Sequence, residues 1–173
     1  LHGRDDSPVL PREPRRSVSS ERTFAQDLDD DPMLERELLR LSVSVTATLR
    51  DEGLSARTVT VKVRDRDFTT RQRSHTLNEA VVSHSVVHRE ARRLLRELRE
   101  RRRGPVRLLG LGLGNLDTAS DEGQLGLFGD ADSTETERDR TVAKVLDDVR
   151  SRFGRDALLP GHITPPRSSN PDD

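Results

Sequence analysis

Basic and small hydroxyl residues alternate with valines in "RTVTVKVRDRDFTTRQRSHTL" (57–77), a spacing that could bind phosphate groups. A period of two is typical of a β-strand, whose side chains point to opposite faces in turn. Val59, Val61 and Val63 then face one way, and Thr58, Thr60, Lys62 and Arg64 face the other. "DRD" (65–67) is the expected turn, and Thr69, Arg71, Arg73 and His75 share one side of the second strand. We assign that side to the face of Lys62 and Arg64, because guanidinium groups and hydroxyls bind phosphate oxygens.

Two acidic clusters and one histidine pair are further candidates for chemistry. "DRD" (65–67) lies in the expected turn, and "DLDDD" (27–31) lies at a helix start, where acids favour the helix dipole. Neither context is typical of catalytic carboxylates that hold metal ions. His84 and His88 have a spacing that can bind zinc on a helix, but no third ligand accompanies them. We therefore expect no metal site in this chain.

Another candidate is "DEGQLGLFGDAD" (121–132), where apolar residues stand in a glycine- and acid-rich segment. Neither a helix nor a strand is expected there, so Leu125, Leu127 and Phe128 have no predicted core to enter. They could bind a pocket of another protein, with Gln124 donating or accepting a hydrogen bond at its edge. The alternative is that the loop folds back and buries Phe128 in its own domain, since five-residue motifs also arise by chance.

Charge is unevenly distributed along the 173 residues, although the formal net charge is only −1. Residues 54–107 hold 15 basic and 6 acidic residues, a net charge of +9. Residues 117–150 hold 4 basic and 10 acidic residues, a net charge of −6. A basic block followed by an acidic one favours a nucleic-acid-binding surface with a segment that avoids it. Cysteine is absent from the sequence, which excludes disulfides and thiolate metal sites.

The elements that would position these residues follow from periodicity and capping signals. We expect a strand over 15–24, a helix from Asp31 to Gly53, the hairpin over 57–77, a helix over 78–104, a strand over 106–116 and a helix over 134–154. Five units follow: a linker (1–14), a domain (15–118), a flexible tether (119–132), an amphipathic helix (133–155) and a disordered tail (156–173).

Each expected helix has a start signal and a stripe of residues for one buried face. In the first, Asp31 is the expected cap before Pro32, and the stripe is Leu34, Leu38, Leu41, Val45 and Leu49. In the second the stripe is Ala80, His84, Val87, Ala91, Leu94 and Leu98. In the third, Thr134 and Glu137 suggest a capping box, and the stripe is Val142, Val145, Val149 and Phe153.

The β-α-β-β-α-β order predicts an α+β fold, in which two helices cover one face of a four-stranded antiparallel sheet and leave the other open. The open face would carry Ser17, Ser19, Thr58, Thr60, Lys62, Arg64, Thr69, Arg71 and Arg73. An RNA-recognition domain shares this order, but it stacks bases on aromatic residues. Here Trp and Tyr are absent, and Phe24 and Phe68 are expected in the core, so that alternative is disfavoured.

Three segments in order, "RRSVSSERTF", "VTVKVRDRDFTTRQRSHTL" and "PVRLLGLGLGNL", resemble the little-finger domain of Y-family translesion DNA polymerases of the DNA polymerase IV type. "GRDDSPVLPREP" is similar to the end of the preceding thumb domain and its linker. The resemblance implies that the open face holds the phosphates of a template-primer duplex in translesion synthesis and DNA repair. By matched position it implies contacts from Arg16, Ser17, Ser19, Thr70, Arg71, Arg73 and Ser74; periodicity places Thr70 and Ser74 on the opposite side.

Gln124, Leu125, Leu127 and Phe128 resemble the pentapeptide with which bacterial replication and repair proteins bind the sliding clamp. The resemblance also implies that the catalytic palm, with its Mg²⁺ ions, lies upstream of this chain. Because the first residue is Leu rather than Met, we expect a piece of a longer enzyme that is inactive alone. The alternative is a non-catalytic adaptor of the same superfamily. A monomer in the cytoplasm, associated with the nucleoid and without membrane contact, is expected.

Overall fold

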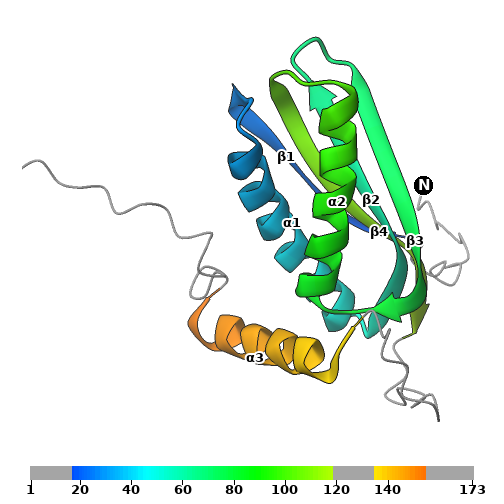
Figure 1. Cartoon of the computed structure of the whole chain (residues 1–173). Helices are drawn as coiled ribbons and strands as arrows, with labels where there is room; N and C mark the ends of the chain where they lie inside the picture. The colour runs from blue at the N-terminus through cyan, green and yellow to red at the C-terminus, as the bar shows by residue number, and fades with distance from the viewer. Residues whose placement is uncertain (1–16, 119–134, 155–173) are drawn as a thin grey trace, which may run out of the picture.

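The computed structural model describes residues 17–118 and 135–154 (Figure 1). Its elements are β1 (Ser17–Leu28), α1 (Asp31–Asp51), β2 (Leu54–Asp65), β3 (Thr70–Val81), α2 (His84–Arg101), β4 (Val106–Thr118) and α3 (Glu137–Phe153). The predictions for Arg16, for the linker at 1–14, for the segment 119–132 with its pentapeptide, and for the tail at 156–173 lie outside the described residues. No helix among the described residues has the length and apolar character to cross a bilayer.

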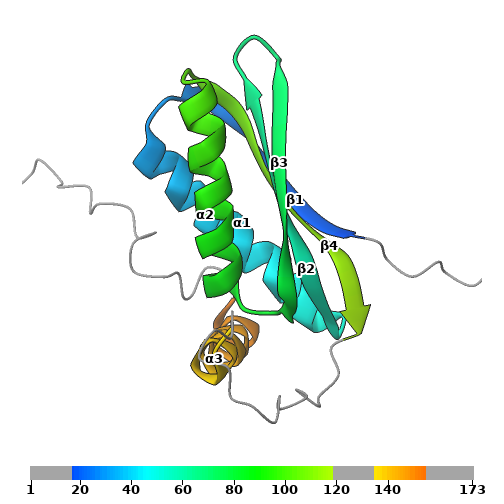
Figure 2. The ribbon, with the colours of Figure 1, turned by 45° about the vertical axis from the view of Figure 1, so that its right-hand side comes forward.

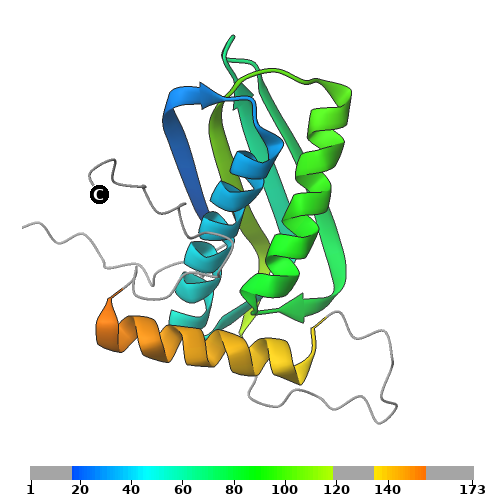
Figure 3. The same cartoon turned by 60° about the vertical axis from the view of Figure 1, so that its left-hand side comes forward.

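The strands form one antiparallel sheet in the order β1-β4-β2-β3. Helices α1 and α2 lie on one of its faces, and the other face has no described helix over it (Figure 2). Helix α3 lies across one end of the α1–α2 layer (Figure 3). The predicted α+β fold is confirmed, with two helices on one sheet face and a third helix after it.

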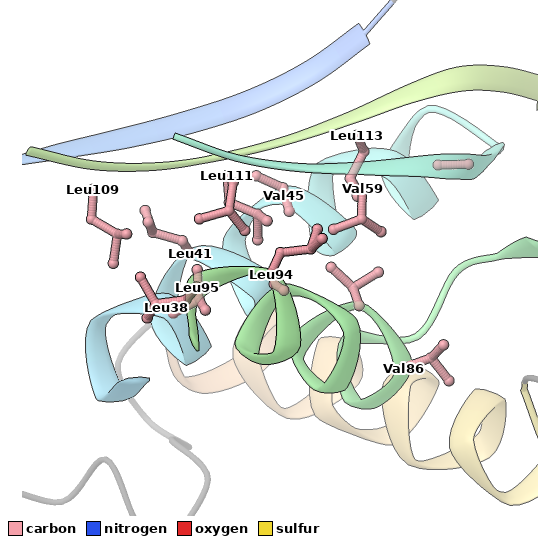
Figure 4. Packing of buried hydrophobic residues seen from close by; sticks show 14 of the residues in the cluster. Leu38, Leu41, Val45, Val59, Val86, Leu94, Leu95, Leu109, Leu111 and Leu113 are labelled. Atoms are coloured by element: carbon pink, nitrogen blue, oxygen red, sulfur yellow. The ribbon is translucent and has the colours of Figure 1, made fainter. Parts of the chain in front are cut away.

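The core lies between the sheet and the two covering helices (Figure 4). It contains the predicted valines of β2, Val59, Val61 and Val63, all fully buried. It also contains the predicted stripe of α1, from Leu34 to Leu49. Leu109, Leu111 and Leu113 of β4 face the same layer, so the apolar alternation of the strands matches the helical stripes across the core.

Several predicted element ends were wrong. Residues 78–81 continue β3 rather than starting a helix, because Val81 pairs with Ala56 of β2 and is fully buried. Helix α2 therefore begins at His84, and Ala80 lies in a strand. β1 continues to Leu28, and the N-cap of α1 is Asp30 rather than Asp31. Asp31 instead accepts a hydrogen bond from Arg99 Nε at 2.7 Å.

The predicted buried face of α3 was also wrong. Val142, Val145 and Phe153 are exposed, whereas Ala143 and Leu146 are buried. Leu146 packs with Leu39 and Val43, two residues on the outer side of α1. The capping box is formed by Thr136 and Asp139, two residues beyond the predicted pair.

Polar contacts explain which face of α3 turns inward. The buried Glu135 accepts hydrogen bonds from the backbone N–H groups of Val82 and Ser83, at 3.0 and 2.6 Å. Asp139 accepts one from Ser85 Oγ at 2.7 Å. Arg50 donates to both carboxylate oxygens of Asp147, at 2.5 and 2.8 Å. These anchors orient the helix with its valine stripe outward, which apolar periodicity alone cannot reveal.

Candidate nucleic-acid interface

The pairing register decides which side chains of the hairpin share a face. Thr60 is paired with Ser74, and Val61 is paired with Arg73. Paired residues of neighbouring strands point to the same side of the sheet. The open-face residues of β2 are Thr58, Thr60, Lys62 and Arg64, and their partners on β3 are Thr76, Ser74, Gln72 and Thr70.

Hydroxyl groups form a row of hydrogen bonds across this face. The Oγ1 atoms of Thr58 and Thr76 lie 3.0 Å apart, and Thr60 Oγ1 lies 2.8 Å from Ser74 Oγ. Arg64 Nε donates to Thr70 Oγ1 at 2.9 Å. Thr70 and Ser74 therefore lie on the open face, and the periodicity argument that put them on the opposite side was wrong.

The same register corrects the predicted positions of Arg71, Arg73 and His75. They lie on the helix-covered face, paired with Val63, Val61 and Val59. Arg71 donates to both carboxylate oxygens of the buried Asp65, at 3.0 and 2.7 Å, and to the carbonyl of Leu98 at 2.5 Å.

The other two side chains of this row also bind acids of α2. Arg73 pairs with Glu97, and His75 Nδ1 lies 2.8 Å from Glu90 Oε1. The polarity of Arg71, Arg73 and His75 favoured an exposed position for these side chains. Their acidic partners lie at other positions in the chain, so the ion pairs could not be seen from the alternating pattern.

The edge strand β1 adds two exposed hydroxyls to the open face, as predicted. Ser17 is paired with Gly114, and Ser19 with Gly112. These glycines are in turn paired with Thr58 and Thr60 on the other side of β4.

A row of glycines along β4 forms the centre of this face, and sequence reasoning missed it. Gly110, Gly112 and Gly114 stand at every second position of "GLGLG", between the buried leucines. A Cβ added to Gly112 would lie 3.7 Å from Ser19 Cβ and 3.9 Å from Thr60 Cβ, so the position has room for a side chain. Glycine in a strand interior is typical of close approach by another backbone. The alternation of Gly with Leu was the signal that could have revealed this row.

The strand residues on this face include two cations, Lys62 and Arg64, and one acid, Glu21. Lys62 Nζ is 2.7 Å from Glu21 Oε1, so part of its charge is neutralised. Arg64 has no acidic partner among residues 17–118 and 135–154. The face is therefore shallow, rich in hydroxyls and weakly cationic, and its paired rows include no aromatic residue.

The acidic clusters considered as metal ligands are ion-paired. Asp67 accepts a hydrogen bond from Arg102 at 2.7 Å, and this bond together with the Thr69 backbone amide lowers the pKa of Asp67 to about 2. Asp29 and Asp31 both bind Arg99, whose side chain is almost fully buried. These aspartates therefore take part in ion pairs within the domain. Within the described residues no three His, Cys, Asp or Glu side chains cluster as a metal site requires.

His84 lies at the start of α2, under α3. Burial lowers the pKa of His84, and the nearby positive charge of Arg50 lowers it further. Asp147 and Asp139 of α3 lie close enough to His84 to oppose this lowering of its pKa. The histidine pair therefore belongs to the packing between α2 and α3.

Comparison with known proteins identifies the domain. Residues 15–127 match the family described as the impB/mucB/samB family C-terminal domain. The chain belongs to this family, and is the little-finger region of a Y-family DNA polymerase of the DNA polymerase IV type.

Sequence relatives agree with that assignment. DNA polymerase IV of Methanoculleus marisnigri is 42% identical over 115 residues, which cover 66% of this chain and 31% of the relative. DNA polymerase IV of Dehalococcoides mccartyi strain CBDB1 is 33% identical over 159 residues, 92% of this chain and 39% of the relative. The little-finger chain thus spans about a third of the length of these relatives.

A solved structure shares the fold. It is described as a Y-family DNA polymerase chimera, is 22% identical, and aligns with a TM-score of 0.55 over 63% of this chain and 30% of that chain. At this identity the likeness supports the fold, and the roles of individual residues rest on the face described above.

Proposed function

We propose that the open face of this little finger holds duplex DNA by its sugar-phosphate backbone. The observation that carries the proposal is the alignment of the glycine row of β4 between hydroxyl rows of β1, β2 and β3. Hydroxyls and cations are the groups that bind phosphate oxygens, and small residues let a backbone approach closely. The contact residues we assign are Ser17, Ser19, Thr58, Thr60, Lys62, Arg64, Thr70 and Ser74, with Arg16 next to them in sequence.

This mode of binding suits an enzyme that copies damaged templates. Contacts to the backbone are independent of base identity, because phosphate and sugar are the same at every position. A lesion on a base then leaves the contacts between the open face and the DNA backbone unchanged. The proposal assigns the enzyme to translesion synthesis and DNA repair in the cytoplasm, at the nucleoid, with Mg²⁺-dependent catalysis in a palm upstream of this chain.

The DNA-binding proposal can be tested by fluorescence anisotropy with a labelled primer-template duplex. In Lys62→Ala/Arg64→Ala we expect weaker binding to every duplex sequence and a salt slope reduced by about two, one for each lost phosphate contact. Arg96→Ala, on the helix-covered side, is the control, since Arg96 is exposed and paired with Glu35. If the double variant changed sequence preference, or if Arg96→Ala had the same effect, the assigned face would be incorrect.

The second part of the proposal is that Gln124, Leu125, Leu127 and Phe128 bind a bacterial sliding clamp. Its support is the pentapeptide sequence and its position, 16 residues between the end of β4 and Glu135. The test is binding of the whole chain to a purified clamp by surface plasmon resonance. We expect micromolar binding that Leu127→Ala/Phe128→Ala abolishes, while the control Val142→Ala/Val145→Ala, on the exposed face of α3, retains it. Equal binding by both variants would contradict the assignment.

A further inference from the structure

Phe68 occupies an unusual position in the loop between β2 and β3. It was predicted in a strand and in the core, but it lies beyond the end of β2 with 64% of its surface exposed. Its φ is +65°, in the left-handed region. Phe68 N–H donates to Asp65 O at 2.9 Å, and Asp65 N–H donates to Thr69 O at 2.9 Å, so the loop is a tight three-residue connection. Hairpins of this length usually place glycine at the left-handed position.

An exposed aromatic ring at a left-handed position is doubly unfavourable for folding. A bulky residue in this backbone region is strained, and the apolar ring gains little from burial. Packing in the domain core does not explain its presence, since the ring is absent from the core cluster that includes Phe24 among its neighbours. The remaining explanation is a contact outside the described domain.

Arg107 holds the ring in place. Its guanidinium carbon lies 4.8 Å from the centre of the Phe68 ring, a cation–π distance. Arg107 lies near the start of β4, where the pairing with β2 is irregular between Val106 and Leu108. Its neighbour Leu108 pairs with Arg64 of β2 and Thr23 of β1. The ring, Arg107 and Arg64 therefore lie at the same end of the sheet, and the loop that carries Phe68 projects beyond the helices at that end (Figure 2).

The charges around Phe68 favour an anionic partner. Arg64 and Arg107 form no ion pair with an acid among the described residues. The two acids of the loop are already paired, Asp65 with Arg71 and Asp67 with Arg102. An aromatic ring under the guanidinium group of Arg107, with that of Arg64 at the same end of the sheet, fits a ligand that alternates phosphate with an apolar ring, which is the structure of a DNA backbone.

We propose that Phe68 is a DNA contact at the tip of the β2–β3 hairpin, where its ring packs against deoxyribose while Arg64 and Arg107 bind the flanking phosphates. This inference rests on the proposed DNA-binding function, because it requires the DNA backbone bound on the open face to continue past the end of that face to the hairpin tip. It assigns the edge of the interface to a residue that composition and periodicity placed in the core.

The chain offers a direct spectroscopic test, because it contains no tryptophan and no tyrosine. Phe68→Trp then introduces a single emitter at the hairpin tip, and Phe153→Trp introduces one on α3, where Phe153 is 73% exposed. Acrylamide quenching is measured with and without unlabelled primer-template duplex, and anisotropy of a labelled duplex reports binding in parallel. We expect duplex to lower the quenching constant of Phe68→Trp at least about threefold and to leave that of Phe153→Trp unchanged.

The outcomes separate the two proposals. If the duplex binds but both tryptophans stay equally accessible, Phe68 faces another partner, such as a protein surface, and this inference is wrong while the open-face proposal stands. If no duplex binds at all, both proposals fail. Protection of both tryptophans to the same degree would indicate a nonspecific effect and would also overturn the inference.

A second variant separates contact from structure. Phe68→Gly relieves the left-handed backbone strain and removes an exposed ring, so the melting temperature is expected to stay the same or to rise. The dissociation constant for duplex is expected to rise about fivefold, with the salt slope unchanged because no charge is lost. A Phe68→Gly chain that binds DNA as tightly as the wild type would contradict the inference.

Discussion

At the residue scale, the hairpin arginines show that charge does not by itself indicate a binding residue. Arg71 and Arg64 are seven positions apart on neighbouring strands, yet they lie on opposite faces of the sheet. Within the described part of the chain Arg64 donates to the hydroxyl of Thr70 and pairs with no acid, whereas Arg71 is 17% exposed and paired with an aspartate that is 6% exposed. The first is available to a ligand, and the second stabilises the fold.

The role of Arg71 leads to a stability prediction. Arg71→Ala leaves the buried Asp65 carboxylate without its bidentate partner, and removing one member of a buried pair is strongly destabilising. We expect the free energy of unfolding to fall by about 3 kcal/mol in urea denaturation.

The control for this prediction is Arg93→Ala. Arg93 pairs with Glu90 and Glu97 on the surface of α2, and we expect a loss of about 0.5 kcal/mol or less. If Arg71→Ala kept full stability and reduced the salt slope of DNA binding instead, its assignment to the fold would be wrong.

His84 leads to a prediction about pH. Its pKa is lowered below its ordinary value near 6.5 because burial disfavours the charged imidazolium. The unfolded chain then binds a proton before the native state does, so stability is fully present above about pH 6.5 and decreases as the pH falls below that value. In His84→Gln this part of the pH dependence is expected to disappear. Urea denaturation at pH 7.5, 6.5 and 5.5 gives the free energy of unfolding of the wild type and of His84→Gln. If this free energy fell equally with pH in both proteins, the assignment would be wrong.

At the element scale, α3 is held against the α1–α2 layer by polar contacts. Glu135 supplies a carboxylate to the two backbone N–H groups that precede α2, and Asp147 binds Arg50 of α1. Three segments far apart in sequence therefore meet at one end of the helix layer. The valine stripe that periodicity assigned to the interior faces outward because these polar anchors outweigh it.

Packing of α3 depends on a small apolar contact. Leu146→Ala removes the only α3 member of the cluster with Leu39 and Val43, and we expect a loss of about 2 kcal/mol for α3 packing. Hydrogen–deuterium exchange of α3 amides is expected to accelerate while exchange in β2 and β4 stays slow. Val145→Ala, one residue away and exposed, is the control and is expected to leave exchange unchanged. Uniform acceleration across the sheet would show that α3 is not a separate stability unit.

At the scale of the whole molecule, the proposed interfaces act together. The open face and the pentapeptide lie on one chain, so binding of one ligand raises the effective concentration of the other. We expect the chain to bind a duplex that carries a loaded clamp at least about tenfold more tightly than the duplex alone. In anisotropy titrations, Leu127→Ala/Phe128→Ala is expected to remove this gain without changing affinity for bare duplex. A gain that persists in the variant would contradict clamp contact through this motif.

The amino-acid sequence alone determined the α+β fold, the core stripe of α1, the part of the α2 stripe from Val87 to Leu98, and the open-face positions of Ser17, Ser19, Lys62 and Arg64. These features depend on local periodicity, which the chain carries residue by residue. Only the tertiary structure decided the facing of Arg71 and Arg73, the outward stripe of α3 and the exposure of Phe68. The facing of the arginines depends on the strand register, and that of α3 depends on carboxylates that bind groups far away in the chain; neither can be deduced from neighbouring positions in the sequence. The exposure of Phe68 depends on the backbone geometry of the turn, which periodicity does not describe.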